Sequence, residues 1–217
     1  QFFMTKNLSV YMTKVENHKA LPKRRSALAH IINYGQFGNI AFDGPGVYLT
    51  ERHPLTILQL DMDKPKNAGV INSISKLLSI EFPIYANTSL GGEERRVIWS
   101  GPNRWLIIEP EGSDLLTLIK SKLSSADFAL TDLSHGRGAI RLKGGKAREV
   151  LMKGSGVDWH LDSFTTNDCA HTKLFDLAAT VDCRDIDVFD IYIARGFAED
   201  FWNILLDATT EFGCRVD

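Results

Sequence analysis

The sequence has 217 residues, of which 44% are hydrophobic, 24% are charged and 10% are aromatic, as in ordinary globular proteins. Its formal net charge of −2 excludes the strongly basic surface that is typical of nucleic-acid-binding proteins. No apolar run approaches the ~18 residues of a transmembrane helix, and the start turns polar after Phe3, so we expect neither a membrane span nor a secretory leader.

Residues 1–54 are predicted to form an N-terminal arm and loops. They show little hydrophobic periodicity and are rich in glycine and proline, with one short helical stretch expected around Ser26–Ile32. Such an arm can order by folding over a partner. A basic cluster within it is interpreted as a solvated face, formed by Lys19, Lys23, Arg24 and Arg25.

Regular elements are predicted from residue 55 to residue 124. The segment LTILQLDM at 55–62 alternates apolar and polar residues, which indicates a half-buried strand. A helix with an apolar face over 70–78 follows, then a hairpin over 97–108 and a second helix over 115–123. Two residues are expected to lie at the starts of these helices, Pro65 and Ser113.

A similar order recurs between residues 136 and 212. The predicted elements are a strand at 139–142, a helix at 147–151, strands at 175–181 and 189–193, and a helix at 201–212. Gly144 and Gly145 are expected to form the turn between the first strand and its helix, because glycine adopts conformations that other residues avoid.

Both halves therefore show the order strand, helix, strand, strand, helix, and internal duplication is the economical interpretation. This order predicts an α+β fold with mixed or antiparallel sheets that are covered by helices on one face. We expect one duplicated domain over residues 55–213, with repeats of about 55–124 and 136–212, rather than two independent domains.

The segment TDLSHGRG at 131–138 contains residue types that are common in active sites. A Ser/His/Asp triad needs side chains that converge in space, whereas neighbours in sequence usually point in different directions. No G-x-S-x-G elbow exposes Ser134, and a G-x-G-x-x-G nucleotide loop fails because residue 141 is arginine. The residues by themselves predict no catalytic centre.

Metal ligands and disulfides are not predicted. The histidines and acids of the second half lack the short spacings of metal ligands, and no C-x-x-C pair is present. Three widely spaced cysteines, Cys169, Cys183 and Cys214, favour a reducing cytoplasm over a disulfide framework. The four tryptophans are expected in the core or at an interface.

Six stretches together resemble the gamma subunit of heterotetrameric sarcosine oxidase. They are RSALAH (25–30), GVYLTERHPLTILQL (46–60), SGPNRWLII (100–108), LTDLSHGRGAIRLKGGKAREVLMKGSGVDWHLDSF (130–164), DCAHTKL (168–174) and FDIYIARGFAEDFWNILLDA (189–208). The most specific part is the D-L-S-H-x-R block at 132–137, followed by C-x-x-T at 169–172. The similarity extends from about residue 25 to residue 213.

The resemblance implies a fold like the folate-binding domain of the glycine-cleavage T protein, which is a duplicated α+β module. It also implies a complex that oxidatively demethylates sarcosine to glycine and transfers the one-carbon unit to tetrahydrofolate. FAD, FMN, NAD, tetrahydrofolate and zinc would be held by the other subunits, which are alpha, beta and delta. This chain would be a cytoplasmic, architectural subunit without catalytic or metal-binding residues of its own.

The sequence departs from its catalytic relatives. T proteins carry a glycine-rich turn followed by paired aspartates, and LAATVDCRDIDVF at 177–189 has neither feature. Asp182, Asp185 and Asp187 are instead spaced as in an acidic hairpin and are expected to be solvated. Related iron–sulfur repair proteins carry K-G-C-Y-x-G-Q, of which residues 167–171 keep only the cysteine.

Two sets of candidate site residues follow. If the cleft between the repeats binds folate, its polar groups are predicted to be Asp132, His135 and Arg137. Arginine and aromatic anchors are expected at an assembly interface, and the candidates are Arg104, Trp105, Phe164, Arg195 and Trp202, with Arg95, Arg96 and Arg137 beside them. Two alternatives stay open: a stand-alone folate-binding aminomethyltransferase, and a scaffold for an unrelated amine dehydrogenase complex.

Overall fold

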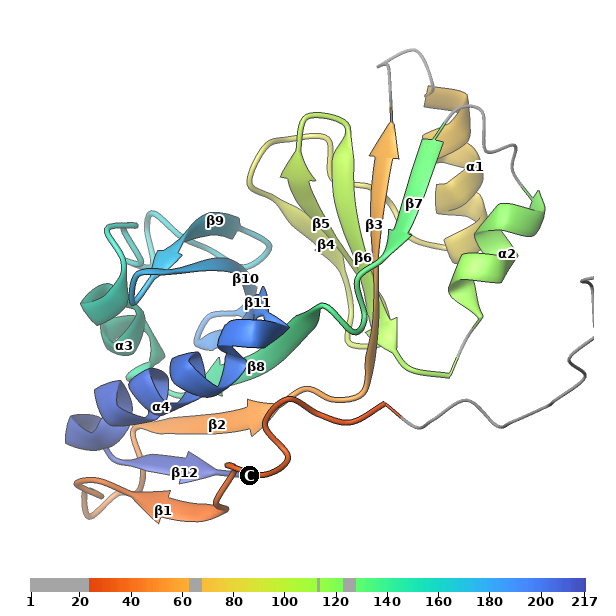
Figure 1. The fold of residues 1–217 in the computed structure, drawn as a ribbon. Coiled ribbons are helices and arrows are strands. Elements are labelled where there is room, and N and C mark those ends of the chain that lie inside the picture. Colours follow the sequence, from red (N-terminus) through yellow and green to blue (C-terminus); the bar gives the residue numbers. More distant parts are fainter. Residues whose placement is uncertain (1–23, 63–67, 113, 123–127) are drawn as a thin grey trace, which may run out of the picture.

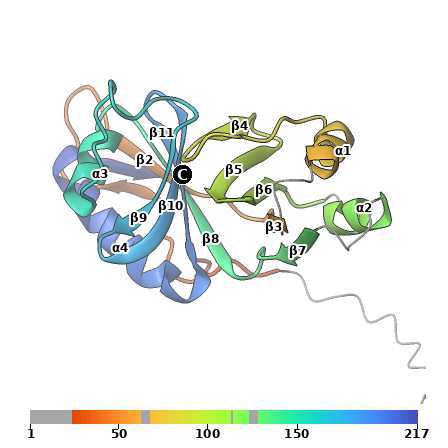
Figure 2. The same cartoon turned by 90° about the horizontal axis from the view of Figure 1, so that it is seen from above.

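The computed structural model describes residues 24–62, 68–112, 114–122 and 128–217. These residues form two sheets that face each other, with helices on the outer side of each sheet (Figures 1 and 2). Some positions discussed above lie outside the described residues, namely Phe3, Lys19, Lys23, Pro65, Ser113 and residue 123, where the second predicted helix ends.

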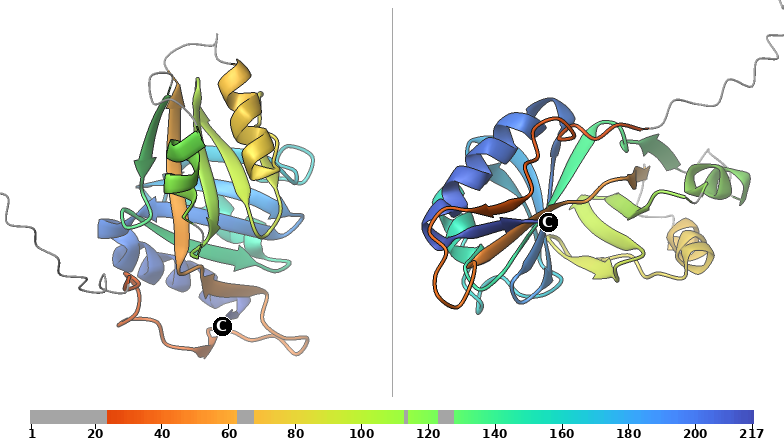
Figure 3. Two further views of the ribbon diagram at one scale, coloured as in Figure 1. Left: turned by 90° about the vertical axis from the view of Figure 1, so that its right-hand side faces the viewer. Right: turned by 90° about the horizontal axis from the view of Figure 1, so that it is seen from below.

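The first module is built on a five-stranded antiparallel sheet with the order β4-β5-β6-β3-β7. Its elements are β3 (Leu55–Met62), α1 (Ala68–Leu78), β4 (Ser89–Gly91), β5 (Arg96–Gly101), β6 (Arg104–Pro110), α2 (Leu115–Lys122) and β7 (Phe128–Asp132). Both helices lie against one face of this sheet (Figure 3, left). The predicted strand at 55–62, the hairpin and the two helices are confirmed.

The second module supplies five strands of a seven-stranded mixed sheet with the order β1-β12-β2-β8-β11-β10-β9. Its elements are β8 (Arg137–Lys143), α3 (Ala147–Gly154), β9 (Cys169–Leu174), β10 (Leu177–Asp185), β11 (Val188–Ala194), α4 (Ala198–Thr209) and β12 (Cys214–Val216), with one 3-10 turn before α4 and one after it. The predicted strand at 175–181 begins only at Leu177, because Phe175 and Asp176 form a turn with positive φ.

The two modules repeat one order of elements, which is strand, helix, three strands, helix, strand. The expected duplication is confirmed, and each copy has two strands more than the sequence indicated. The added strands are β4 and β7 in the first module and β9 and β12 in the second. Three of them lie at sheet edges and two have only three residues, so they lack the long apolar alternation that marks the inner strands.

The segment before residue 55 is part of the folded body, which corrects the prediction of an arm with loops. β2 (Val47–Glu51) lies inside the seven-stranded sheet, parallel to β12 and antiparallel to β8, and β1 (Gly35–Phe37) extends the edge beyond β12. Gly44, Pro45 and Gly46 precede β2 and Pro54 follows it, and these residues masked its short alternation in the sequence. The stretch around Ser26–Ile32 is a turn rather than a helix, and it buries Leu28 in the core.

Three apolar clusters hold the layers together. One lies between the seven-stranded sheet and α3 and α4, and a second lies between the five-stranded sheet and α1 and α2. The third lies between the two sheets and includes Ile57 and Ile98 from one sheet and Tyr192 from the other. Each sheet thus buries both faces, and the modules share an interior rather than forming independent domains.

Gly144 forms the predicted turn between β8 and α3. Its φ is +122°, and a Cβ atom at this position would lie 2.5 Å from the carbonyl oxygen of Gly46. Both the backbone conformation and the close approach of the segment before β2 therefore require glycine here.

Candidate functional site

The D-L-S-H segment connects the modules, because β7 ends at Asp132 and β8 begins at Arg137. The Asp132 carboxylate accepts hydrogen bonds from the backbone N–H of Ser134 at 2.8 Å and from its hydroxyl at 2.5 Å. The Ser134 hydroxyl oxygen in turn accepts the backbone N–H of Ile57 at 2.9 Å. This segment is therefore fastened to β3, and Asp132 and Ser134 serve local structure.

Asp132 is held in its charged form. Partial burial opposes ionisation, but the two hydrogen bonds from Ser134 and the nearby charge of Arg24 hold the pKa of Asp132 below its usual range. The guanidinium of Arg24 lies 3.7 Å from this carboxylate and 2.9 Å from that of Glu111. Asp132 is thus an anion that balances a neighbouring arginine.

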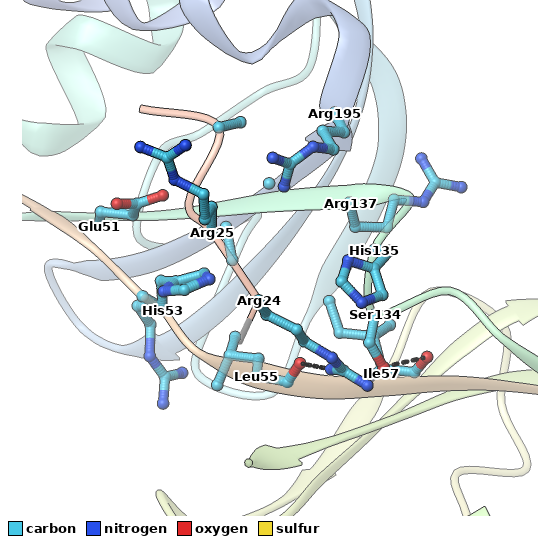
Figure 4. Close-up of a pocket in the computed structure, with 14 residues that line it drawn as sticks. Arg24, Arg25, Glu51, His53, Leu55, Ile57, Ser134, His135, Arg137 and Arg195 are labelled. Carbon is cyan, nitrogen blue, oxygen red and sulfur yellow. Dashed lines mark hydrogen bonds between the residues drawn. The ribbon is translucent and has the colours of Figure 1, made fainter. Parts of the chain in front are cut away.

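A small basic pocket opens beside this segment, at the junction of the two modules (Figure 4). Its free volume is about 20 Å³, and apolar residues such as Leu55 and Ile57 form part of its wall. Its basic and acidic groups are Arg24, Arg25, Arg52, Arg137, Arg195, His53, His135 and Glu51. Five arginines and a single carboxylate make the pocket a local concentration of positive charge.

Two of these arginines are neutralised by neighbours. Arg24 pairs with Glu111 and also donates to the carbonyl oxygen of Leu55 at 3.1 Å, and Arg52 pairs with the buried Asp190 at 2.5 Å. The carboxylate of Glu51 accepts the hydroxyl of Ser26.

The other three arginines, Arg25, Arg137 and Arg195, have no carboxylate within ion-pair distance among the described residues. In Figure 4 the guanidinium of Arg195 is turned towards the middle of the view, whereas that of Arg137 points away from it. The positive charge that is left without a counter-ion therefore belongs to these three side chains.

The structure brings two of the three predicted folate-cleft residues together. His135 and Arg137 line the pocket. Asp132 is not among the lining residues, but it contacts Arg24, which is one of them. Small-molecule sites usually measure roughly 300–1,000 Å³, so a pocket of about 20 Å³ has no room for a pterin ring.

The five predicted interface residues separate into two groups. Trp105, Phe164 and Trp202 are core residues, only 5%, 6% and 1% exposed, so these aromatic side chains offer no anchor at the surface of this chain. This corrects the prediction, because their apolar area is already used inside the modules. Arg104 is exposed and pairs with Asp61, and Arg195 lines the basic pocket. A partner contact at Arg104 and Arg195 stays a prediction.

Two further interface candidates, Arg95 and Arg96, take part in contacts inside the chain. Arg95 pairs with Glu109 at 2.6 Å, and Arg96 is buried between the sheets. Arg96 donates to both carboxylate oxygens of Asp182, each at 2.9 Å.

Asp182 is fully buried, which overturns the expectation that it is solvated. It lies directly opposite Asp190 on the neighbouring strand, and Asp190 is also fully buried. Four arginines from four segments surround the pair, namely Arg52, Arg96, Arg141 and Arg184. Polar residues at alternate positions of a strand normally indicate a face in water, but here that face is covered by the other sheet.

Glu93 extends this ionic network towards the surface. Its carboxylate lies 3.0 Å from Arg141, 3.3 Å from Arg184 and 3.6 Å from Arg52. Partial burial opposes ionisation, but the hydrogen bond from Arg141 and the charges of the three arginines hold the pKa of Glu93 below its usual range. The network joins the β4–β5 connection of the first module to the seven-stranded sheet.

A larger groove of about 800 Å³ lies on another side, between the C-terminal part of α1 and the loops 79–88 and 165–168. Two large apolar side chains in its lining face the solvent, Ile84 with 78% of its surface exposed and Tyr85 with 73%. Isolated exposed apolar residues are common, but adjacent ones beside an apolar groove are typical of surfaces that another protein covers.

Across the described ranges, no helix has the length and apolar character needed to cross a membrane. The same residues contain no cluster of three or more His, Cys, Asp or Glu side chains arranged to hold a metal ion.

Comparison with known proteins gives consistent matches. A sarcosine oxidase subunit gamma from Corynebacterium sp. (strain P-1) is 30% identical over 120 residues, and one from Arthrobacter sp. is 31% identical over 120 residues. Each alignment covers 55% of this chain, and the chain spans 59% of the length of these curated relatives.

Among solved structures, a chain of the heterotetrameric sarcosine oxidase from Corynebacterium sp. U-96, in complex with pyrrole 2-carboxylate, matches with a TM-score of 0.76 and 25% identity. The match covers 87% of this chain and 96% of that one. The glycine cleavage system aminomethyltransferase T from Bartonella henselae matches with a TM-score of 0.58 and 13% identity, over 79% of this chain and 48% of that one. The second likeness concerns the fold alone, and it confirms the expected folate-binding-domain-like architecture.

The family described as "Sarcosine oxidase, gamma subunit family" matches residues 62–211, which is most of the chain and includes nearly all of both modules. The D-L-S-H-x-R block and the C-x-x-T segment lie within this range. The chain belongs to the sarcosine oxidase gamma subunit family.

Proposed function

We propose that this chain is the gamma subunit of a heterotetrameric sarcosine oxidase and serves there as a structural subunit without chemistry of its own. The main support for this proposal is that the layer between the two sheets is filled by side chains. In a duplicated fold this layer is a natural place for a ligand, yet here it is filled by the third apolar cluster and by the arginine network around Asp182 and Asp190. A substrate would have to displace buried, paired charges, which is costly.

The oxidation reaction and its cofactors are proposed to belong to the other subunits. These would be the alpha, beta and delta chains, which would hold FAD, FMN, NAD, tetrahydrofolate and zinc. The assembly would oxidise sarcosine to glycine and pass the one-carbon unit to tetrahydrofolate. The exposed apolar surface at Ile84 and Tyr85 supports a role in assembly, since such a surface is better covered than left in water.

We place the complex in the cytoplasm. All three cysteines are free and buried, and proteins of oxidising compartments generally use such residues in disulfides.

The first test is biochemical isolation of the chain. Purified without partners, it should be colourless and should not consume oxygen with sarcosine, and co-expression with the other subunits should yield a flavin-bearing complex that contains it. Sarcosine turnover by the isolated chain would contradict the proposal. Titration with tetrahydrofolate tests the alternative of a stand-alone folate-binding protein, which predicts micromolar affinity of the lone chain.

A second test addresses the structural role. The remaining subunits should fail to assemble, or should lose activity faster on dilution and heating, when this chain is omitted. Full activity and an unchanged half-life of a complex without the chain would contradict a structural role.

A further inference from the structure

We propose that the basic pocket at the module junction is an oxyanion site, which takes a carboxylate or phosphate group between Arg25, Arg195 and the neighbouring histidines. The pocket of Figure 4 is not explained by the structural role proposed above. Its first test needs only the isolated chain, so it can succeed or fail independently of that role.

Charge is the first argument. The chain as a whole is slightly acidic, with a net charge of −2, but the pocket wall contains five arginines against one glutamate. Arg24 and Arg52 are neutralised by Glu111 and Asp190.

Arg25, Arg137 and Arg195 are the residual charge, since no carboxylate of the described residues pairs with them. Arg195 is half-buried, so water screens its charge less than it would on an open surface, whereas Arg25 is exposed. A bound anion would neutralise this charge.

Fixed geometry is the second argument. Four separate segments form the pocket, at residues 24–27, 51–57, 134–139 and 195, and hydrogen bonds join them to one another. Arg24 donates to the Leu55 carbonyl, Ser134 accepts the Ile57 N–H, and the Arg195 N–H donates to the Gly136 carbonyl at 2.9 Å. These bonds fix the backbone around the pocket, so the wall of the site is already formed before a ligand arrives and less entropy is lost on binding.

Size decides the class of ligand. The free volume of about 20 Å³ is enough for roughly one water-sized group, so the oxygens of a carboxylate or a phosphate can enter while a whole cofactor cannot. Guanidinium groups match such oxygens because their planar N–H donors can bind two of them at once. Exposed His53 and His135 at the wall can add ring N–H donors.

One oxyanion chemistry can come from two sources, a small free anion or an acidic side chain of another subunit. The first experiment uses the full isolated chain with inorganic phosphate or succinate as probes, at ionic strength held constant with sodium chloride. Calorimetric titration should show saturable binding with a dissociation constant of about 1 mM or lower. The variants Arg195→Gln and Arg25→Gln should each weaken it about tenfold.

Arg215→Gln is the matched control, because Arg215 is an exposed arginine on β12 that is not part of the pocket. It should bind the probes as the native chain does. All variants should keep the native circular dichroism spectrum and unfolding midpoint, which shows that the fold is intact.

The second experiment measures assembly of the same variants with the remaining subunits at low and high salt. If the isolated chain binds neither probe but Arg195→Gln and Arg25→Gln weaken assembly about tenfold and Arg215→Gln does not, the source is an acidic side chain of a partner. Saturable probe binding that these two variants lose assigns the site to a free anion. If the probes do not bind and assembly is unchanged, or if binding survives in both pocket variants, the proposal is overturned.

Discussion

Arg96 of β5 donates hydrogen bonds to both carboxylate oxygens of Asp182 of β10, each at 2.9 Å, although the two residues belong to different modules and different sheets. The Ser89 hydroxyl donates to the same carboxylate, and both charged side chains are buried. The two sheets are therefore joined by a charge pair in a buried layer, where an unpaired charge is far more costly than in water.

This pair predicts a strong effect of a single substitution. Asp182→Asn leaves Arg96 buried without its main counter-ion and should lower the free energy of unfolding by about 3–5 kcal/mol. Denaturant unfolding of the isolated chain measures this. Asp162→Asn is the control, because that side chain is 92% exposed and should change stability by less than about 0.5 kcal/mol. A similarly small loss in Asp182→Asn would contradict the role given to the pair.

Glu93 predicts a dependence of stability on pH. Because its pKa is lowered in the folded chain, its contribution is fully present above the unfolded-state value, about 4.3, and is lost as pH falls through the folded-state value. Glu93→Gln should therefore show a flatter decline of stability with acid in that window than the native chain. At pH 7 the loss should be only about 0–1 kcal/mol, since the side chain is 63% exposed.

The control for Glu93 is the adjacent Glu94, which forms no ion pair with the described residues. Stability curves of Glu94→Gln from pH 3 to pH 7 should follow those of the native chain. If Glu93→Gln and Glu94→Gln behaved alike, the ionic network would not depend on Glu93.

Trp202 predicts a loss of stability in the isolated chain. Its side chain packs in the cluster under α4, so Trp202→Ala should cost about 3–5 kcal/mol even without any partner. Arg104→Gln should leave the stability of the isolated chain almost unchanged, because the Arg104–Asp61 pair lies at the surface. Thermal unfolding of both variants distinguishes the core position from an interface anchor, for which stability would be lost only in the complex.

The three cysteines are expected not to react with a thiol reagent in the native chain. Burial raises the pKa of Cys169 to about 12 and that of Cys183 to about 11, and burial also raises the pKa of Cys214. At pH 8 almost none of these thiols is ionised, and thiolate is the reactive form. A disulfide reagent should therefore modify no cysteine in the native chain and three in denaturant. Rapid modification of the native chain would show that a thiol is accessible.

The periodic elements and the duplication could be predicted from the sequence. LTILQLDM, the hairpin over 97–108 and the four helices could be predicted because alternation at two residues or at three to four residues records which side chains meet a core. The D-L-S-H-x-R block, a local motif, also indicated the family. The edge strands were missed because short, one-sided elements carry little of this periodic signal.

The candidate site could be predicted only in part. His135 and Arg137 were found from a local motif, whereas Arg25, His53 and Arg195 reach the same pocket from segments far away in the chain. Nothing in their local sequence indicates this meeting, because it depends on how the β2–β3 connection and the end of β11 come together.

Which faces and side chains are buried depends on how the elements pack in three dimensions. β2 lies in the middle of a sheet because it pairs with β12 on one side and with β8 on the other. Asp182 lies in the interior because a second sheet covers the polar face of β10. The pattern of one strand reports that its two faces differ, but it does not report what lies opposite each face. Burial is a property of two packed surfaces, and one sequence segment describes only one of them.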